Sequence, residues 1–256
     1  MKKISGSIIL LWFISAVVLP SCKVSDYPSS STPINHQIWD SLLRKNVNEQ
    51  GFVNYKGFIA DSVQFNQYLN LLSSNHPNSK NWSKEERLAY WINAYNAFTV
   101  KLIVDHYPVE SIKDIKNGIP FVNTVWDIKF IKIEDATYDL NNIEHGILRP
   151  KFKDPRIHFA VNCASFSCPK LLNHAYTGEK VNAQLDQAAR DFLADPSKNI
   201  IKKEEVQLSK ILSWYRGDFK KYDDILDLVN TYGPMQVDKN AKVSYLDYIW
   251  TLNEAK

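Results

Sequence analysis

The residue types best suited to chemistry gather in residues 154–169, DPRIHFAVNCASFSCP. This stretch holds His158, Asn162, Cys163 and Cys168. A cysteine attacks as its thiolate, so it needs a lowered pKa or a neighbouring base, and the base needs a group that orients it. The same two cysteines can instead form a disulfide. We therefore weigh a thiol-dependent hydrolase or transferase, with Cys163 as nucleophile, against a disulfide-clamped binding domain.

Within this stretch, residues 156–162 alternate in a way that predicts a half-buried strand. Cys163 would then lie at the carboxyl end of the strand, where ligands often bind. On such a strand His158 and Cys163 point to opposite faces, because they are five residues apart, and this weakens a direct pair. The residues expected in the core are Ile157, Phe159 and Val161.

The base that would serve Cys163 is His158 or His145. His145 belongs to a helix expected over residues 141–149, and a helix end can pack against the end of a strand. Four further residues could orient the base or contact a ligand: Asn93, Asn96, Asn162 and Asp218. Asn93 and Asn96 share one helix face, although hydrogen bonds to neighbouring loops would also explain them. Asp218 could equally cap a helix or pair with Arg216.

The non-catalytic alternative is a binding or scaffold domain in which Cys163 and Cys168 form a disulfide. Such a bridge closes a short loop and removes little chain entropy, so it suits a local clamp. A third alternative is zinc held by both cysteines with one or two of His145, His158 and His174. The cysteine spacing fits zinc, but no second paired motif completes the ligand set. We therefore predict no metal and no cofactor.

Other polar and aromatic residues near these motifs have simpler explanations. Glu144 is expected to cap its own helix. The aromatic residues expected in the core, rather than in a stacking platform, are Trp91, Tyr95, Trp214 and Tyr215.

Hydrophobic periodicity predicts the elements that must position these side chains. The clearest helix begins at a capping box, Ser83 to Glu86, and continues until Pro108 closes the region. The other predicted elements are helices at residues 36–48, 61–73, 181–193 and 223–232, a short extended piece at 51–55, a hairpin from 124–133 to 137–140, and strands at 206–208 and 243–250. One α+β domain over residues 36–256, with helices packed around a small sheet, is the expected fold.

The first 21 residues have the pattern of a lipoprotein signal peptide. Lys2 and Lys3 precede an apolar run of twelve residues from Ile8 to Leu19, well short of the roughly 20 that span a bilayer. The run ends in LPSC, which predicts Cys22 as the acylated residue. Residues 22–35 are rich in Ser and Pro and predict a flexible tether. We therefore expect a lipid-anchored protein of the bacterial cell envelope, at the periplasmic face or the outer membrane.

The charge of the chain argues against a nucleic-acid partner. Residues 1–21 contain two lysines and no acid, so their removal lowers the formal net charge from +3 to +1. Nucleic-acid binding would require a clustered basic excess. The expected partners are the membrane, through the lipid on Cys22, and an unidentified small molecule or peptide.

Five separated motifs, taken together, resemble the family called domain of unknown function 547. They are residues 87–99 (RLAYWINAYNAFT), 143–149 (IEHGILR), 154–169, 208–219 (LSKILSWYRGDF) and 245–250 (YLDYIW). The resemblance covers roughly residues 50–250. It implies a shared fold, but it brings no established activity to this chain, and a fold alone would not decide the function.

Overall fold

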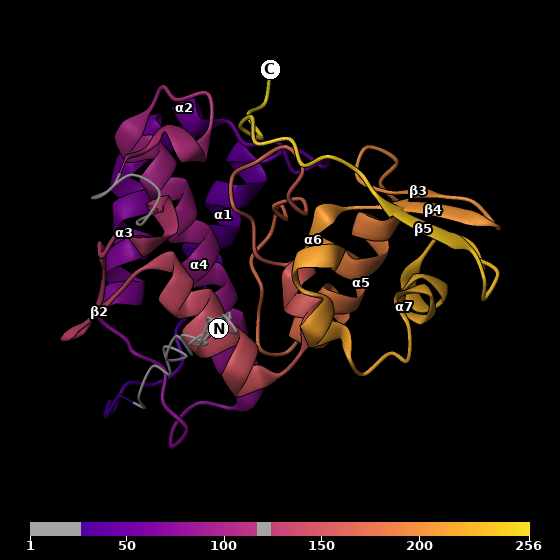
Figure 1. Ribbon diagram of the computed structural model, residues 1–256. Helices are drawn as coiled ribbons and strands as arrows, with labels where there is room; N and C mark the ends of the chain where they lie inside the picture. Colours follow the sequence, from indigo (N-terminus) through magenta and orange to yellow (C-terminus); the bar gives the residue numbers. More distant parts are fainter. Residues whose placement is uncertain (1–26, 117–123) are drawn as a thin grey trace, which may run out of the picture.

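Helices from the first part of the chain form one side of the molecule (Figure 1). In the computed structural model, which describes residues 27–116 and 124–256, these are α1 (Gln37–Asn46), α2 (Tyr55–Ala60), α3 (Ser62–Ser73) and α4 (Lys84–His106). The helices predicted at 36–48 and 61–73 are confirmed as α1 and α3. The extended piece predicted at 51–55 ends at Asn54, because Tyr55 is the first residue of the short helix α2.

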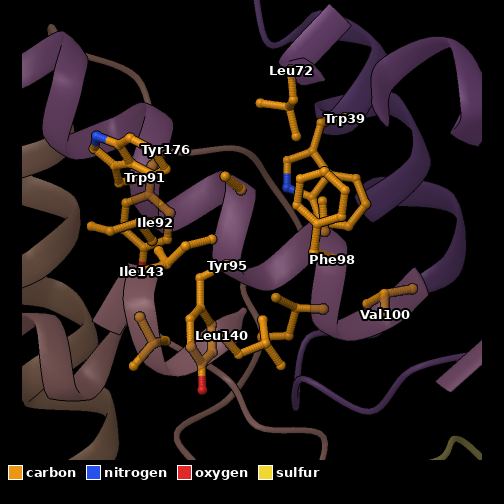
Figure 2. Close-up of a cluster of buried hydrophobic side chains, with 14 of the residues drawn as sticks. Trp39, Leu72, Trp91, Ile92, Tyr95, Phe98, Val100, Leu140, Ile143 and Tyr176 are labelled. Carbon is orange, nitrogen blue, oxygen red and sulfur yellow. The ribbon is translucent and has the colours of Figure 1, made fainter. Parts of the chain in front are cut away.

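Helix α4 is the centre of this side. The predicted capping box is present, because Ser83 Oγ accepts a hydrogen bond from the Glu86 amide at 3.1 Å and the Glu86 carboxylate accepts one from the Ser83 amide at 2.7 Å. Nearly every residue from Leu88 to Ile103 is buried, as expected of a helix surrounded by other elements. Figure 2 shows Trp91, Ile92, Tyr95 and Phe98 of α4 in one cluster with residues of other elements, including Trp39, Leu72, Leu140, Ile143 and Tyr176.

The predicted hairpin exists but is shorter than expected. Strand β1 (Ile131–Ile133) pairs antiparallel with β2 (Ala136–Tyr138), with Ile131 opposite Tyr138. Residues Val125–Asp127 form a 3₁₀ helix, η2, instead of the first part of a strand. The Asp127 carboxylate causes this turn by accepting hydrogen bonds from the amide and the hydroxyl of Thr124, at 2.8 and 2.7 Å. A second 3₁₀ turn, η1, covers Ile112–Asp114.

The segment that carries His145 is a π-helix, η3 (Asn142–Phe152). It contains Pro150 and ends at Lys153, whose φ of 54° is left-handed. A helix at this place was predicted, but its π form was not. Single π-turns are found frequently at functional sites, because they change the direction in which side chains project.

The prediction of a strand over residues 156–162 is wrong. Pro155–Phe159 is a 3₁₀ helix, η4, that starts where Asp154 Oδ1 accepts a hydrogen bond from the Arg156 amide at 3.0 Å. Proline is well suited to the first position of a helix, so Asp154 and Pro155 start a helical turn here. The predicted core residues Ile157, Phe159 and Val161 are nevertheless buried.

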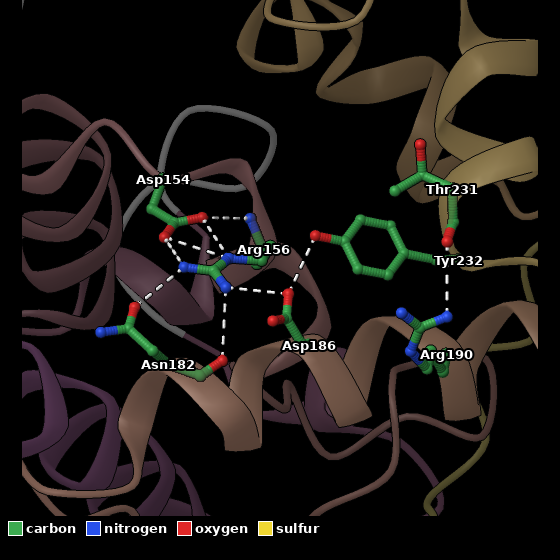
Figure 3. Close-up of polar contacts among 7 residues, drawn as sticks. All are labelled: Asp154, Arg156, Asn182, Asp186, Arg190, Thr231 and Tyr232. Carbon is green, nitrogen blue, oxygen red and sulfur yellow. Dashed lines mark hydrogen bonds and ion pairs between the residues drawn. The ribbon is translucent and has the colours of Figure 1, made fainter.

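Arg156 fastens η4 to the helices beside it (Figure 3). Its guanidinium donates to the Asp154 carboxylate at 2.5 Å and to the Asp186 carboxylate at 2.9 Å. Asp186 also accepts a hydrogen bond of 2.9 Å from the Tyr232 hydroxyl. These ion pairs raise the pKa of Arg156 and lower the pKa of Asp186, where they outweigh the opposite effect of burial.

The second side of the molecule combines three helices with a small sheet (Figure 1). Its elements are α5 (Val181–Ala194), β3 (Ile200–Ile201), β4 (Glu205–Leu208), α6 (Lys210–Trp214), η5 (Arg216–Phe219), α7 (Ile225–Tyr232) and β5 (Lys242–Tyr245). The strand order is β3-β4-β5, with β3 antiparallel and β5 parallel to β4. Phe159 of η4 packs against Phe192 and Phe219, with ring centroids 5.3 and 5.8 Å apart. The predicted helices at 181–193 and 223–232 are confirmed as α5 and α7, and residues 209–219 contain α6 and η5.

The C-terminal segment joins the two sides. The strand predicted at 243–250 ends at Tyr245, after which the chain runs back to the first side (Figure 1). It is held there by isolated bridges, Ser111 to Thr251, Ser165 to Leu252 and Val53 to Glu254. The chain is thus a single α+β domain, as predicted.

The part of the predicted tether that the structure describes lies against the domain. Ser31 Oγ donates to the His76 carbonyl at 2.5 Å, and the Ser31 carbonyl accepts from Trp82 Nε1 at 3.0 Å. Ser29 Oγ donates to Glu134 at 2.8 Å. These contacts place Ser29 and Ser31 of the predicted tether against the domain.

The predicted signal peptide, residues 1–21, and the predicted lipidation site, Cys22, lie outside the described residues. Among helices of residues 27–116 and 124–256, none is both long and apolar enough to cross a membrane.

Candidate functional site

A cavity of about 310 Å³ lies where the π-helix η3, the 3₁₀ helix η4, helix α6 and the C-terminal segment meet. Four of the predicted site residues line it: His145, His158, Cys163 and Cys168. Residues 141–168 supply these four and three further lining residues, and the rest of the lining comes from α4, η2, α6 with the residue after it, and the C-terminal segment. The site is therefore a product of the tertiary fold.

Behind one wall of this cavity, Asp218 orients His158. The Asp218 carboxylate accepts a hydrogen bond of 2.7 Å from His158 Nε2 and a two-point ion pair from Arg149, at 2.5 and 2.9 Å. Burial alone would raise the pKa of Asp218, but the hydrogen bonds from His158 and Arg149 outweigh it and hold the pKa far below its usual range. Asp218 is thus a carboxylate, with Arg149 as its partner and not Arg216.

The other nitrogen of His158 has no hydrogen-bond partner among the described residues. The His158 side chain is 1% exposed, and Nδ1 is 4.0 Å from Glu144 Oε1, too far for a direct hydrogen bond. The ring stacks on Tyr215, with centroids 3.9 Å apart and planes inclined by 22°. Because the ionised Asp218 requires a donor at Nε2, the neutral imidazole has its free lone pair at Nδ1.

Glu144 lies on the floor of the cavity and does not cap its helix, contrary to the prediction. Its side chain is 7% exposed. The hydroxyl groups of Tyr95 and Tyr215 lie beside it: burial raises the pKa of both tyrosines, and the Glu144 charge raises it further. A buried carboxylate and an unpaired imidazole nitrogen therefore face each other at the bottom of the cavity.

His145, the second candidate base, is held by Arg149. Its Nδ1 lies 2.6 Å from Arg149 Nη1, and its ring lies parallel to that of Tyr215 at 6.2 Å. Burial is the main cause of its lowered pKa, and the charge of Arg149 lowers the pKa further. His145 thus lines the cavity without contacting either cysteine.

Cys163 and Cys168 are joined in a disulfide, with their Cα atoms 6.2 Å apart. The Cys163 sulfur contacts the hydroxyls of Ser165 and Tyr248, both at 3.3 Å. Cys168 Sγ accepts hydrogen bonds from the Cys163 amide at 3.0 Å and from the Tyr248 hydroxyl at 3.2 Å. Both cysteines line the cavity, so the disulfide forms part of its wall. No histidine of the described chain makes a hydrogen bond to either sulfur.

Asn162 fixes the loop that carries this disulfide. Its Oδ1 accepts a hydrogen bond from the Ala164 amide at 2.9 Å, and its Nδ2 donates to the Pro169 carbonyl at 2.7 Å. Ala164 has a φ of 61°, which is uncommon for a residue with a side chain, and the Asn162 bond supports that conformation. Asn162 thus positions the loop and does not face the cavity.

The two asparagines proposed to bind a ligand are also engaged with backbone groups. Asn96 Nδ2 donates to the Ala160 carbonyl at 3.0 Å, and its Oδ1 accepts from the Asn162 amide at 2.9 Å. Asn93 makes the same double contact with the backbone of Tyr176, at 2.8 and 3.0 Å. Both side chains are buried and neither lines the cavity. Their geometry favours the alternative interpretation, in which they hold neighbouring loops.

The mouth of the cavity is a group of aromatic side chains, the aromatic rim, made of Trp126, Trp214, Tyr248 and Trp250. Ring centroids are 4.5 Å apart for Tyr248 and Trp250, 4.8 Å for Trp214 and Tyr248, and 5.6 Å for Trp126 and Trp250. Trp214 is 51% exposed, so its assignment to the core is wrong. The assignment is confirmed for Trp91 and Tyr95, which are buried. Sequence reasoning missed this rim, although the exposed-looking YLDYIW motif contains two of its members.

The zinc alternative finds no support in the described residues. They contain no group of three or more His, Cys, Asp or Glu side chains that could hold a metal ion. His174 does not line this cavity and lies with Lys170, Asn173 and Gln184 around another.

Fold and cavity together define a single α+β domain with an aromatic-walled pocket. Residues 79–193 match the model of a family described as "Protein of unknown function, DUF547". The match covers a little under half of the chain and includes the segments around Asn93, His145 and Cys163. Residues 208–219 and 245–250, which also counted toward the resemblance found in the sequence, lie outside the match. No curated protein and no solved structure gives a significant match to the chain.

Proposed function

We propose that this domain binds a small molecule, or a side chain of a peptide, in the cavity between η3, η4, α6 and the C-terminal segment. The main support is the contrast between the apolar mouth of this cavity and its polar floor. The mouth is the aromatic rim, and the floor holds Glu144 and the unpaired Nδ1 of His158. Ligand sites in proteins are typically such apolar concavities with a few convergent polar groups.

The disulfide favours binding over thiol chemistry in this form of the protein. A cysteine attacks as a thiolate, and the Cys163 sulfur is bonded to Cys168. Because Asn162 and Tyr248 hold the disulfide loop, the wall it forms is rigid. A rigid wall lowers the conformational entropy that the protein loses when a ligand binds.

The test is a ligand-observed NMR screen of chemically varied small molecules against the wild type and the variant Trp214→Ala. We expect at least one class of compound to bind the wild type and to lose about tenfold or more in affinity in the variant. Ile59→Ala is the control, because Ile59 is also an exposed apolar residue but does not line the cavity. Hits that bind all three proteins equally would place binding elsewhere and contradict the proposal.

A second candidate function is a thiol-dependent hydrolase or transferase that acts after the disulfide is reduced. The observation that favours it is the presence of Cys163 and the Asp218-oriented His158 on the same cavity. A base held by a carboxylate is the arrangement that activates a nucleophile. This function requires that Cys163 reacts with electrophiles only after reduction, and that this reactivity is lost when His158 is replaced. Labelling of the cysteines with iodoacetamide measures both.

We further propose that the protein is anchored to the bacterial cell envelope through a lipid on Cys22. The apolar run followed by LPSC supports this, and a disulfide suits a protein outside the reducing cytosol. Metabolic labelling with a fatty-acid probe should mark the wild type and not Cys22→Ala. Equal labelling of both proteins would remove this proposal.

A further inference from the structure

We infer that the ligand of this cavity carries a protonated primary amine, which binds between Glu144 Oε1 and His158 Nδ1 while its apolar body lies against the aromatic rim. This inference rests on the proposed binding function and names the class of ligand.

Asp218 determines which nitrogen of His158 carries the hydrogen. Asp218 is held ionised by Arg149 and accepts the hydrogen on Nε2. With its hydrogen on Nε2, the ring turns its other nitrogen, Nδ1, toward Glu144; this atom is buried and has no hydrogen-bond partner in the described part of the chain. Buried polar atoms are rarely left unpaired, because the hydration they lose is then not replaced.

A second acceptor, on Glu144, faces this nitrogen. Glu144 Oε1 lies 4.0 Å from His158 Nδ1. Two acceptors at this distance need a donor group that carries at least two hydrogens and contacts both. An ammonium group provides three hydrogens and no acceptor.

The charged residues around the floor of the cavity leave Glu144 without a cation partner among the described residues. Asp218 and Arg149 form a two-point ion pair and largely neutralise each other. Within the described residues, no Lys or Arg side chain lies within ion-pair distance of Glu144; its neighbours are His158 Nδ1, 4.0 Å from Oε1, and the uncharged hydroxyl groups of Tyr95 and Tyr215. A buried carboxylate is stabilised by a nearby cation, so a positive ligand group would pair with Glu144.

The aromatic rim suits a ligand that joins a positive charge to an apolar body. Indole and phenol rings attract cations through their faces and bury apolar groups. Lys113 already places its ammonium 4.6 Å from the centre of the Trp250 ring, so this part of the rim is compatible with positive charge. An amine on an apolar body matches both ends of the cavity, whereas a carboxylate ligand would meet the negative charge of Glu144.

The test uses four probes with one body: phenethylamine, phenethyl alcohol, phenylacetate and the N,N,N-trimethyl derivative of phenethylamine. Binding is measured by NMR titration and calorimetry on the protein with its disulfide intact. We expect phenethylamine to bind at least about tenfold more tightly than each of the others. The trimethyl compound keeps the charge but has no hydrogen to donate to Nδ1 or Oε1.

Two variants locate the contact. Glu144→Gln should weaken phenethylamine binding at least about tenfold and leave binding of the alcohol nearly unchanged, whereas Trp214→Ala should weaken both. A thermal unfolding curve for each variant shows whether it is folded. If Glu144→Gln does not fold, Tyr95→Phe, which keeps Glu144 but removes a hydroxyl beside it, should alter amine binding selectively.

The outcomes separate this inference from the broader one. If the alcohol or phenylacetate binds as tightly as the amine and depends on Trp214, the amine inference is overturned and the binding function stands. If the amine binds equally to wild type and Glu144→Gln, the assigned contact is wrong. If none of the four probes binds, the amine inference fails, and the wider screen alone decides whether the cavity binds ligands.

Discussion

Asp218 accepts a hydrogen bond of 2.7 Å from His158, a residue 60 positions earlier in the chain. This contact decides which nitrogen of His158 faces the cavity. It also connects η5 with η4, two short helical turns that have little stability of their own. The orientation of the candidate site thus depends on one charge-assisted hydrogen bond between distant segments.

Replacing Asp218 by asparagine should destabilise the domain and alter the histidine. The change removes the charge that pairs with Arg149 and holds the proton at His158 Nε2, and loss of hydrogen bonds to a charged group typically costs about 1–3 kcal/mol. Chemical denaturation measures the first effect, and nitrogen chemical shifts of His158 report the tautomer.

Asp223→Asn is the matched control for this change, because Asp223 is an exposed aspartate in the nearby loop before α7. Its stability should stay within about 0.5 kcal/mol of the wild type. If Asp218→Asn were as stable as the control and kept the wild-type tautomer, Asp218 would not orient His158.

Truncation of Phe159 tests the core next to the site. Phe159 is 1% exposed and packs against Phe192 and Phe219, so Phe159→Ala should cost about 3–5 kcal/mol of unfolding free energy. Val63→Ala is the control, since Val63 is 75% exposed and its truncation should cost less than about 0.5 kcal/mol. Similar values for the two variants would place Phe159 outside the core.

The sequence was informative wherever local rules decide the structure. Helix α4 has a capping box at Ser83 and apolar residues at helical spacing, so its start and burial could be predicted. The alternation at Ile157, Phe159 and Val161 correctly indicated burial. It did not indicate conformation, because alternating residues of a short 3₁₀ turn can also be buried, and the start signal from Asp154 and Pro155 fits both a turn and a helix.

The sequence indicated the part of the candidate site from His145 to Cys168, and it indicated Asp218 as one of four residues that could orient the base. Trp126 and Trp250 meet in the aromatic rim although they lie at opposite ends of the second half of the chain, and no local pattern connects them. The partner of Asp218 was also missed: Arg216 is closer in sequence, but Arg149 of the π-helix reaches the carboxylate. Pairings of this kind depend on how distant elements pack.

The stability of the domain should depend on pH through His36. This residue is buried, with Nδ1 2.8 Å from the Tyr68 hydroxyl, and burial lowers its pKa to about 4. Between about pH 4 and pH 6.5 the unfolded chain therefore binds more protons than the folded one, so the stability rises with pH. The contribution of His36 is present above pH 6.5 and is lost as the pH falls toward 4, by about 3 kcal/mol in all.

The measurement for His36 is the unfolding free energy of wild type and His36→Gln between pH 4 and pH 8. The variant should show a weaker decrease below about pH 6.5, because glutamine does not titrate. Above about pH 7 the two curves should run parallel, which serves as the internal control. An unchanged slope in the variant would mean that His36 is accessible to protons in the folded state.

The disulfide leads to a prediction about stability. The bridge links residues five positions apart in sequence, and closure of such a loop of about six residues should contribute about 2 kcal/mol by the loop-entropy relation. Denaturation of Cys163→Ser, Cys168→Ser protein against the wild type measures it. A double variant as stable as the wild type would show that the clamp adds no stability.

Labelling of the cysteines decides between clamp and nucleophile. Without reductant, iodoacetamide should modify neither Cys163 nor Cys168 in the folded protein, because their sulfurs are bonded to each other. After reduction, Cys163, which is partly exposed in the cavity, should react faster than Cys168, which is 4% exposed.

If His158 activates Cys163, this advantage should persist at pH 6–7, where a thiol with a pKa near about 8.5 is almost wholly protonated. It should disappear in His158→Gln. An advantage that survives in His158→Gln would reflect exposure alone and remove the second candidate function. Modification of Cys163 before reduction would contradict the clamp, since it would mean that the folded protein carries free thiols.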